Sequence, residues 1–213
     1  MVQVLGFDHA EEWSIRQLLD RFRAGHFRLG DLRQIEKADL PGYEGKVMPR
    51  LGHGGRVETT MYLSSCNAFT IAHELAHVSD IAVRRQDSVD NLGCGMPSQW
   101  HLAYKMSSEY YANRIACRHS DGEDCFRAFK SDAAGLLDAA KRHDWGSFMV
   151  YFALCLGVLH GIDRMDLDPL AMVAPQGLAK LPERVQAGMA GFAEQSVGFF
   201  DGYADLAPSA LAA

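Results

Sequence analysis

The stretch from Thr70 to Val78 reads TIAHELAHV, with two histidines four residues apart and a glutamate directly after the first. Residues four apart lie on one face of an α-helix, so His73 and His77 can bind one zinc ion together. Zinc lowers the pKa of a bound water from about 15.7 toward about 7, so that Glu74 can accept its proton and the hydroxide can attack a carbonyl. The stretch therefore predicts the active-site helix of a peptide-hydrolysing zinc enzyme.

The alternative for this stretch is an ordinary amphipathic helix that carries two solvated or core-capping histidines. The residues around the motif are uncharged, as a half-buried helix requires: Ile71, Ala72, Leu75, Ala76 and Val78. This context favours the metal-binding interpretation.

A catalytic zinc site usually has three protein ligands, so a third must come from elsewhere. Residues 78–83 contain neither glycine nor histidine, which excludes the metzincin arrangement. Glu109 is the better candidate, in a second predicted helix that starts near residue 99 with Ser98 as N-cap. Asn113 lies on the same face, four residues on, and could hydrogen-bond a ligand histidine or be a solvated polar residue.

Two segments of the chain together resemble a known group of enzymes. FTIAHELAH at residues 69–77 and EYYANRIA at 109–116 are similar to the pattern F-T-x-A-H-E-x-x-H followed by E-x-x-A-N-x-x-A. This pattern is typical of ImmA/IrrE-type metallopeptidases, a gluzincin group. The resemblance covers roughly residues 57 to 118, and it departs at Ile115, where an aromatic residue is usual.

The resemblance implies His73, His77 and Glu109 as zinc ligands and Glu74 as general base in a zincin-like fold. Members of this group are small intracellular proteases, often carried on mobile elements, that cut or inactivate transcriptional repressors. A protein substrate, such as a regulator or repressor, is therefore expected.

For other polar residues near the motifs, the sequence leaves more than one role open. Asp80 follows on nearly the same face as the histidines. It is expected to orient an imidazole or to be a solvated charge at the helix end, because a third ligand from that helix would hardly complete a tetrahedron.

Candidates for stabilising a developing oxyanion are Tyr110 and Tyr111 first, then Tyr104, His101 and His160. Cys94, between glycines, could occupy the open zinc position and keep the enzyme latent, or simply lie in a turn.

Before the motif, residues 56–63 alternate in the manner of a strand. We expect an edge strand there, either pairing with an extended substrate or only covering the helix. Ser65 or Asn67 is expected to cap the active-site helix, which then runs to about Arg85.

The remaining patterns predict an α+β, mostly helical fold. Helices are expected near residues 9–24, 122–142 and 182–204, and residues 147–162 form an apolar stretch that is too short to cross a bilayer and is read as a buried central helix. The predicted organisation is one zincin-like domain over residues 1–213, with a catalytic core to about 120 and a helical extension over about 121–206.

Composition supports an intracellular enzyme. The chain has 213 residues, 48% apolar, and a net charge of −6 without long basic runs, which argues against nucleic-acid binding. No secretory signal is visible, and five cysteines without framework spacing suit a reducing cytoplasm. We expect no membrane association, and the oligomeric state stays open.

The function predicted from these features is zinc-dependent hydrolysis of a peptide bond in a protein substrate. One alternative is a non-catalytic binding module that keeps the zincin fold. Another is an effector or toxin protease exported without a cleavable signal. An intact Glu74 favours an enzyme over the binding module.

Overall fold

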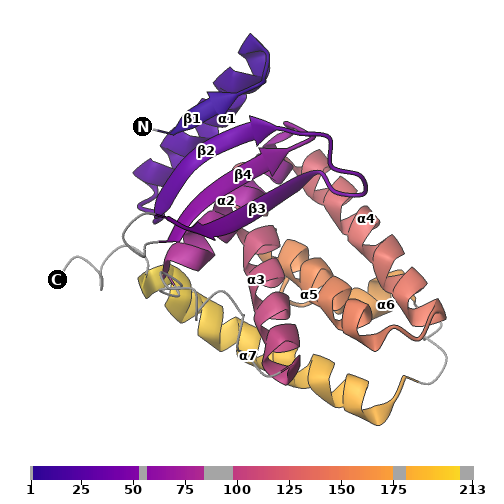
Figure 1. Cartoon of the computed structure of the whole chain (residues 1–213). Helices are drawn as coiled ribbons and strands as arrows, with labels where there is room; N and C mark the ends of the chain where they lie inside the picture. The colour runs from indigo at the N-terminus through magenta and orange to yellow at the C-terminus, as the bar shows by residue number, and fades with distance from the viewer. Residues whose placement is uncertain (1, 53–56, 84–97, 175–180, 207–213) are drawn as a thin grey trace.

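The computed structural model describes residues 2–52, 57–83, 98–174 and 181–206, and combines a small sheet with a larger set of helices (Figure 1). Within these ranges the strands are β1 (Gln3–Leu5), β2 (Asp31–Lys37), β3 (Gly45–Leu51) and β4 (Val57–Leu63). The helices are α1 (His9–Ala24), α2 (Ala68–Val83), α3 (Ser98–His119), α4 (Gly122–Lys141), α5 (Trp145–Gly161), α6 (Pro169–Val173) and α7 (Glu183–Leu206). The predicted α+β, mostly helical class is confirmed.

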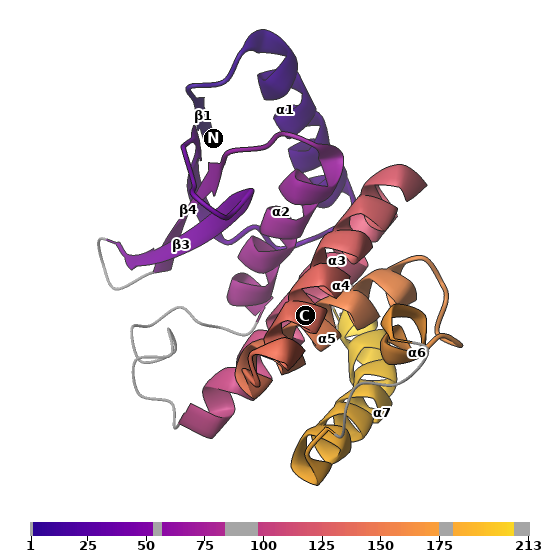
Figure 2. The same cartoon turned by 90° about the vertical axis from the view of Figure 1, so that its right-hand side faces the viewer.

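The sheet has the strand order β1-β2-β4-β3. The first three strands in this order are parallel, and β3 runs antiparallel to β4. Alternate residues of β4 are buried, from Val57 to Leu63, and helices α1 and α2 both lie on one face of the sheet (Figure 2). The core between sheet and helices includes Ile15, Phe22, Ile35, Met61, Ile71 and Leu75.

The prediction of an edge strand at residues 56–63 is wrong, because β4 is paired on both sides, with β2 and with β3. The outer strand next to β4 is β3. Alternation in sequence reveals the two faces of a strand but not its neighbours. β3 contains Pro49, which has no N–H to donate and is tolerated in an outer strand.

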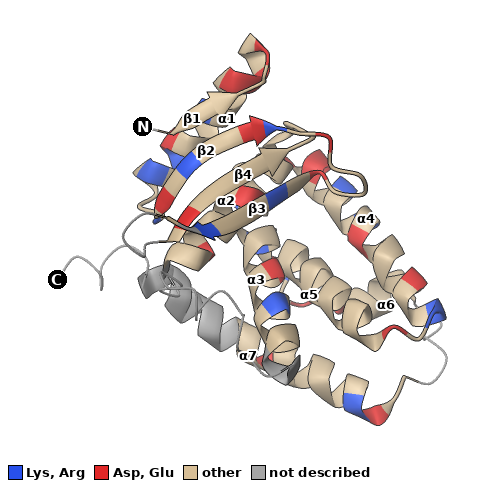
Figure 3. Cartoon of the chain, in the orientation of Figure 1, with Lys and Arg blue, Asp and Glu red and all other residues tan. Residues whose placement is uncertain are grey.

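The predicted helices are confirmed with shifts of one or two residues at their ends. α1 begins after Asp8, which forms a capping box with Glu11, and α4 begins after the N-cap Asp121. The apolar stretch is α5, which carries no charged residue in Figure 3 and is mostly buried. Among the described helices none is long and apolar enough to span a membrane.

The helices after residue 121 pack directly on those that carry the motifs. α5 packs against α3, and α4 packs against α5 and contacts α2 and α3. The approach of α5 to α3 is close at Gly157, where an added Cβ would lie 2.5 Å from the backbone oxygen of Tyr110. This close packing brings α4 and α5 to the same region as the histidines of α2.

Candidate metal centre

The start of α2 is fixed by hydrogen bonds to a loop before β3. Asn67 accepts a hydrogen bond from the backbone N–H of Thr70 through Oδ1, at 2.7 Å, as expected for the N-cap. The Thr70 hydroxyl and the Asn67 amide both donate to Glu44 Oε2, at 2.6 and 3.1 Å. These bonds position the first turn of α2, and with it the two histidines one and two turns further on.

His73, His77 and Glu109 come together as a group that could hold a metal ion. The Nε2 atoms of the histidines are 3.0 Å apart, and Glu109 Oε2 lies 3.5 Å from His73 Nε2 and 3.4 Å from His77 Nε2. A tetrahedral ion with bonds of about 2.0–2.2 Å separates its ligand atoms by roughly 3.3–3.6 Å. The two separations to Glu109 match this range and the two histidine nitrogens lie slightly closer together than it, so the three donor atoms would surround one ion after a small movement of the rings.

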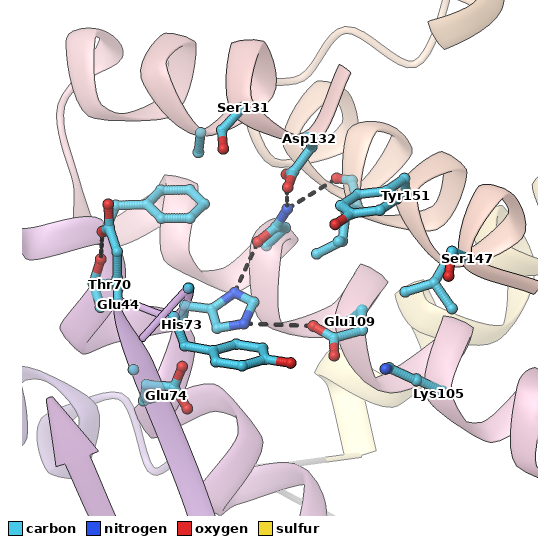
Figure 4. A pocket seen from close by; sticks show the side chains of 18 of the residues that line it. Glu44, Thr70, His73, Glu74, Lys105, Glu109, Ser131, Asp132, Ser147 and Tyr151 are labelled. Carbon is cyan, nitrogen blue, oxygen red and sulfur yellow. Dashed lines mark hydrogen bonds and ion pairs between the residues drawn. The ribbon is translucent and has the colours of Figure 1, made fainter. Parts of the chain in front are cut away.

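His73 is held by a hydrogen-bond chain that reaches α4 and α5. Its Nδ1 lies 2.8 Å from Asn113 Oδ1, and the Asn113 amide group donates to Asp132 Oδ2 at 2.9 Å and to the carbonyl of Leu154 at 3.0 Å (Figure 4). Because the amide nitrogen has two acceptors, the amide oxygen faces the ring and accepts from Nδ1–H. Nε2 of His73 then faces His77 and Glu109, and of the two roles considered for Asn113 the structure shows the hydrogen bond to a histidine.

His77 is held by a second chain of similar construction. Its Nδ1 lies 3.0 Å from Ser108 Oγ, and the Ser108 hydroxyl donates to Asp80 Oδ2 at 2.8 Å. The single hydroxyl proton is used on Asp80, so Ser108 accepts from Nδ1–H of His77. Asp80 is fully buried and lies outside the ligand group. The structure thus places Asp80 where it orients His77 through a serine.

In the metal-free chain, the charges of this site are mutually dependent. Burial by itself lowers the pKa of His73, but the hydrogen bond to Glu109 and the charges of Glu74 and Glu109 outweigh it and raise the pKa to about 9. Burial favours the neutral form of Glu109, yet the charge of His77 and hydrogen bonds to both histidines hold its pKa well below the usual range. A site that attracts a proton this strongly is also suited to a cation.

Glu74 lies beside the ligands and faces the same cavity. It is only 6% exposed, and burial raises the pKa of its carboxyl, an effect that the charges of His73 and His77 oppose. Gly45 at the start of β3 makes room for it: an added Cβ would lie 2.5 Å from Glu74 Cγ and 2.6 Å from Oε1. A carboxylate with a raised pKa is well suited to accept and return a proton.

A cavity of about 740 Å³ adjoins His73 and Glu109. Its described walls come from the loop 42–45, from α2 and α3, and from α4 and α5. Figure 4 shows His73, Glu74 and Glu109 on one side of this space, with Asp132 of α4 and Tyr151 of α5 on another. A molecule bound in the cavity would thus contact His73 and Glu109 on one side and the wall formed by α4 and α5 on the other.

The residues considered for oxyanion stabilisation lie elsewhere. The hydroxyl of Tyr110 is 2.6 Å from His160 Nδ1, and its ring packs against Phe192 of α7. Neither Tyr110 nor Tyr111 belongs to the described lining of the cavity, and the same holds for His101, Tyr104 and His160. Adjacent residues on a helix point about 100° apart, so Tyr110 faces away when Glu109 faces the ligands.

Donors that line the cavity were missed by sequence reasoning. They include Tyr43 in the loop before β3, Lys105 on α3 and Tyr151 on α5. Of these, only Lys105 had a sequence signal, because it precedes Glu109 by one helical turn and so shares its face. Ser108, next to Glu109, and Asp132, on another helix, had no signal of this kind. Cys94 lies outside the described residues.

Comparisons with family models, curated proteins and solved structures find no match for this chain. Functional inference therefore rests on the site: two imidazole nitrogens and one carboxylate oxygen converge, and a buried carboxylate and a cavity lie beside them. Such an arrangement can bind a cation and activate water next to a bound ligand.

Proposed function

We propose that this chain is a zinc-dependent metallopeptidase that hydrolyses a peptide bond in a protein or peptide substrate. The observation that carries the proposal is the convergence of His73, His77 and Glu109, with donor atoms 3.0 to 3.5 Å apart, beside the buried Glu74. Two histidines and a glutamate are a ligand set of catalytic zinc sites in peptidases.

The donor set supports a zinc ion over magnesium or calcium. Magnesium and calcium prefer oxygen ligands, whereas imidazole suits zinc. Each histidine also donates a hydrogen bond from the N–H of its second ring nitrogen to a fixed acceptor, Asn113 or Ser108, as ligand histidines generally do.

The proposed reaction adds water across the peptide bond. Bound zinc supplies an acidified water and polarises the carbonyl. Glu74 accepts a proton from the attacking water, whose oxygen bonds to the carbonyl carbon, and passes the proton to the leaving nitrogen as the C–N bond breaks. Tyr43, Tyr151 and Lys105 line the cavity and carry donors that could stabilise negative charge on the carbonyl oxygen.

We further propose a zincin-like fold of the ImmA/IrrE type and a regulatory protein as substrate. The support is the pair of sequence segments at 69–77 and 109–116, together with a small sheet that precedes the active-site helix. An extended substrate would pair with β3, because β4 is already paired on both sides.

The test is cleavage of a peptide library by zinc-loaded protein and by Glu74→Gln. The substitution keeps the size of the side chain and all three ligands, so zinc content should stay unchanged while cleavage is lost. Equal cleavage by both proteins would refute the role of Glu74. A chain that holds zinc and binds peptides but cleaves none would be a binding module instead of an enzyme.

A further inference from the structure

The wall of the cavity formed by α4 and α5 has a composition of its own. Val150 and Leu154 of α5 supply apolar surface, and Asp132 of α4 supplies a carboxylate. Ser131 and Tyr151 also line the cavity and add hydroxyl groups (Figure 4). A pocket with aliphatic sides and one acidic group suits a ligand with an apolar stem and a polar tip.

Asp132 differs from the other acidic residues of this wall in its partners. Asp124 forms an ion pair with Arg127 at 3.1 Å, and Asp144 caps α5 by accepting from the backbone N–H of Ser147 at 3.1 Å. Asp132 uses Oδ2 for Asn113, and no cation within the described parts of the chain lies in ion-pair distance of it. Its Oδ1 is left for a ligand.

The charge balance of the cavity points in the same direction. Among the Lys, Arg, Asp and Glu residues of its described lining the carboxylates outnumber the cations, which are Lys105 and Arg127, and further positive charge lies only at the His73 end of the cavity. Arg127 is already paired with Asp124 and Glu123. A positively charged substrate group would therefore supply what the wall around Asp132 lacks, since a half-buried carboxylate is stabilised by a cation that hydrogen-bonds to it.

We propose that this wall is a specificity pocket for lysine or arginine, which binds the basic side chain next to the bond that is cut. The methylene stem packs against Val150 and Leu154, and the cationic head hydrogen-bonds to Asp132. The assignment rests on the proposed peptidase function, and it names the substrate class that this site selects.

The test measures binding apart from catalysis, with zinc-loaded Glu74→Gln and the peptides acetyl-Gly-Ser-Ala-X-Ala-Ser-Gly-amide. X is lysine, the uncharged norleucine of similar length, or glutamate. The lysine peptide is expected to bind about tenfold more tightly than the norleucine peptide, as a charged hydrogen bond provides. Adding Asp132→Asn should remove this ratio, with zinc content measured alongside. Adding Asp138→Asn, on the exposed face of α4, should leave it unchanged.

Equal or undetectable binding of the lysine and norleucine peptides overturns the assignment without any change to Asp132. Tightest binding of the glutamate peptide also overturns it, and would make Lys105 the selecting residue. Cleavage by the wild type without a basic preference would leave the peptidase proposal standing and the pocket assignment refuted. A lysine preference in binding, with no cleavage by the wild type, would support the pocket assignment and refute the peptidase proposal.

Discussion

The two histidines of α2 are held by hydrogen-bond chains of the same construction in different surroundings. In each chain the ring donates to a neutral side chain of α3, which is anchored by an aspartate. The chain from His77 ends at Asp80, which is fully buried on α2 itself. The chain from His73 ends at Asp132, which lies on α4 and lines the cavity.

This difference separates two tasks. The hydrogen-bond chain through Ser108 connects neighbouring helices, and its residues do not line the cavity, so we expect it to affect metal binding alone. The chain through Asn113 joins the metal ligand to the wall where we place a substrate side chain. Occupancy of that wall and the orientation of His73 are therefore expected to depend on each other.

The largest effect should come from Glu109, which serves both histidines at once. Glu109→Ala removes one of three ligands and leaves two imidazoles without their shared carboxylate. Zinc affinity should fall by more than the about 10- to 100-fold that is typical of losing one supporting residue. Titration against a chromophoric chelator measures this. A smaller loss would mean that Glu109 is no ligand.

A second substitution tests Glu74 as the base and changes no residue of either hydrogen-bond chain. In Gly45→Ala the added Cβ would displace the side chain of Glu74. Because a shift of about 1 Å can cost about 100-fold in rate, turnover should fall by up to that factor while zinc affinity stays unchanged. Gly122→Ala is the control, since an added Cβ there meets nothing within 4 Å. Equal turnover of the two variants would place the base elsewhere.

The proposed difference between the two hydrogen-bond chains can be tested directly by substituting the middle residue of each. Ser108→Ala and Asn113→Ala should each weaken zinc binding by about 10- to 100-fold. Only Asn113→Ala should also change the preference for the lysine peptide, because only that chain reaches Asp132. Ser108→Thr keeps the hydroxyl and should restore zinc affinity. An altered peptide preference in Ser108→Ala would contradict the separation of tasks.

The smallest effect expected is that of pH on metal binding. His73 has a pKa raised to about 9 in the metal-free chain, so it is protonated at neutral pH and must lose this proton to bind zinc. Zinc affinity should therefore rise about tenfold per pH unit between pH 7 and 8 and level off above about 9. An affinity that does not change over this range would show that no proton is displaced.

The sequence predicted those parts of the molecule whose signal is local. The four-residue spacing of His73 and His77 places them on one face of a helix, and Asn67 caps that helix as expected. The sequence predicted that Glu109 reaches the histidines, and of the two roles considered for Asn113, on the same helical face, the structure shows the hydrogen bond to His73. Short-range periodicity is sufficient for features of this kind.

Features that depend on tertiary packing escaped the sequence. Nothing in the residues around Asp132 indicates that it lies behind Asn113, because α4 is placed by its packing on α5. The pairing of β4 with β2 and β3 depends on strands that are distant in sequence, and so the edge was assigned to the wrong strand. Tyr110 adjoins Glu109 in sequence but faces α7.

The central claim is that His73, His77 and Glu109 hold one zinc ion beside Glu74. Its most direct test is the zinc content of the wild type, Glu74→Gln and Glu109→Ala, purified without chelator or nickel and measured by elemental analysis. The account predicts about one zinc per chain in the first two and strong depletion in the third. No zinc in the wild type, even after its addition, or equal zinc in Glu109→Ala, would contradict it.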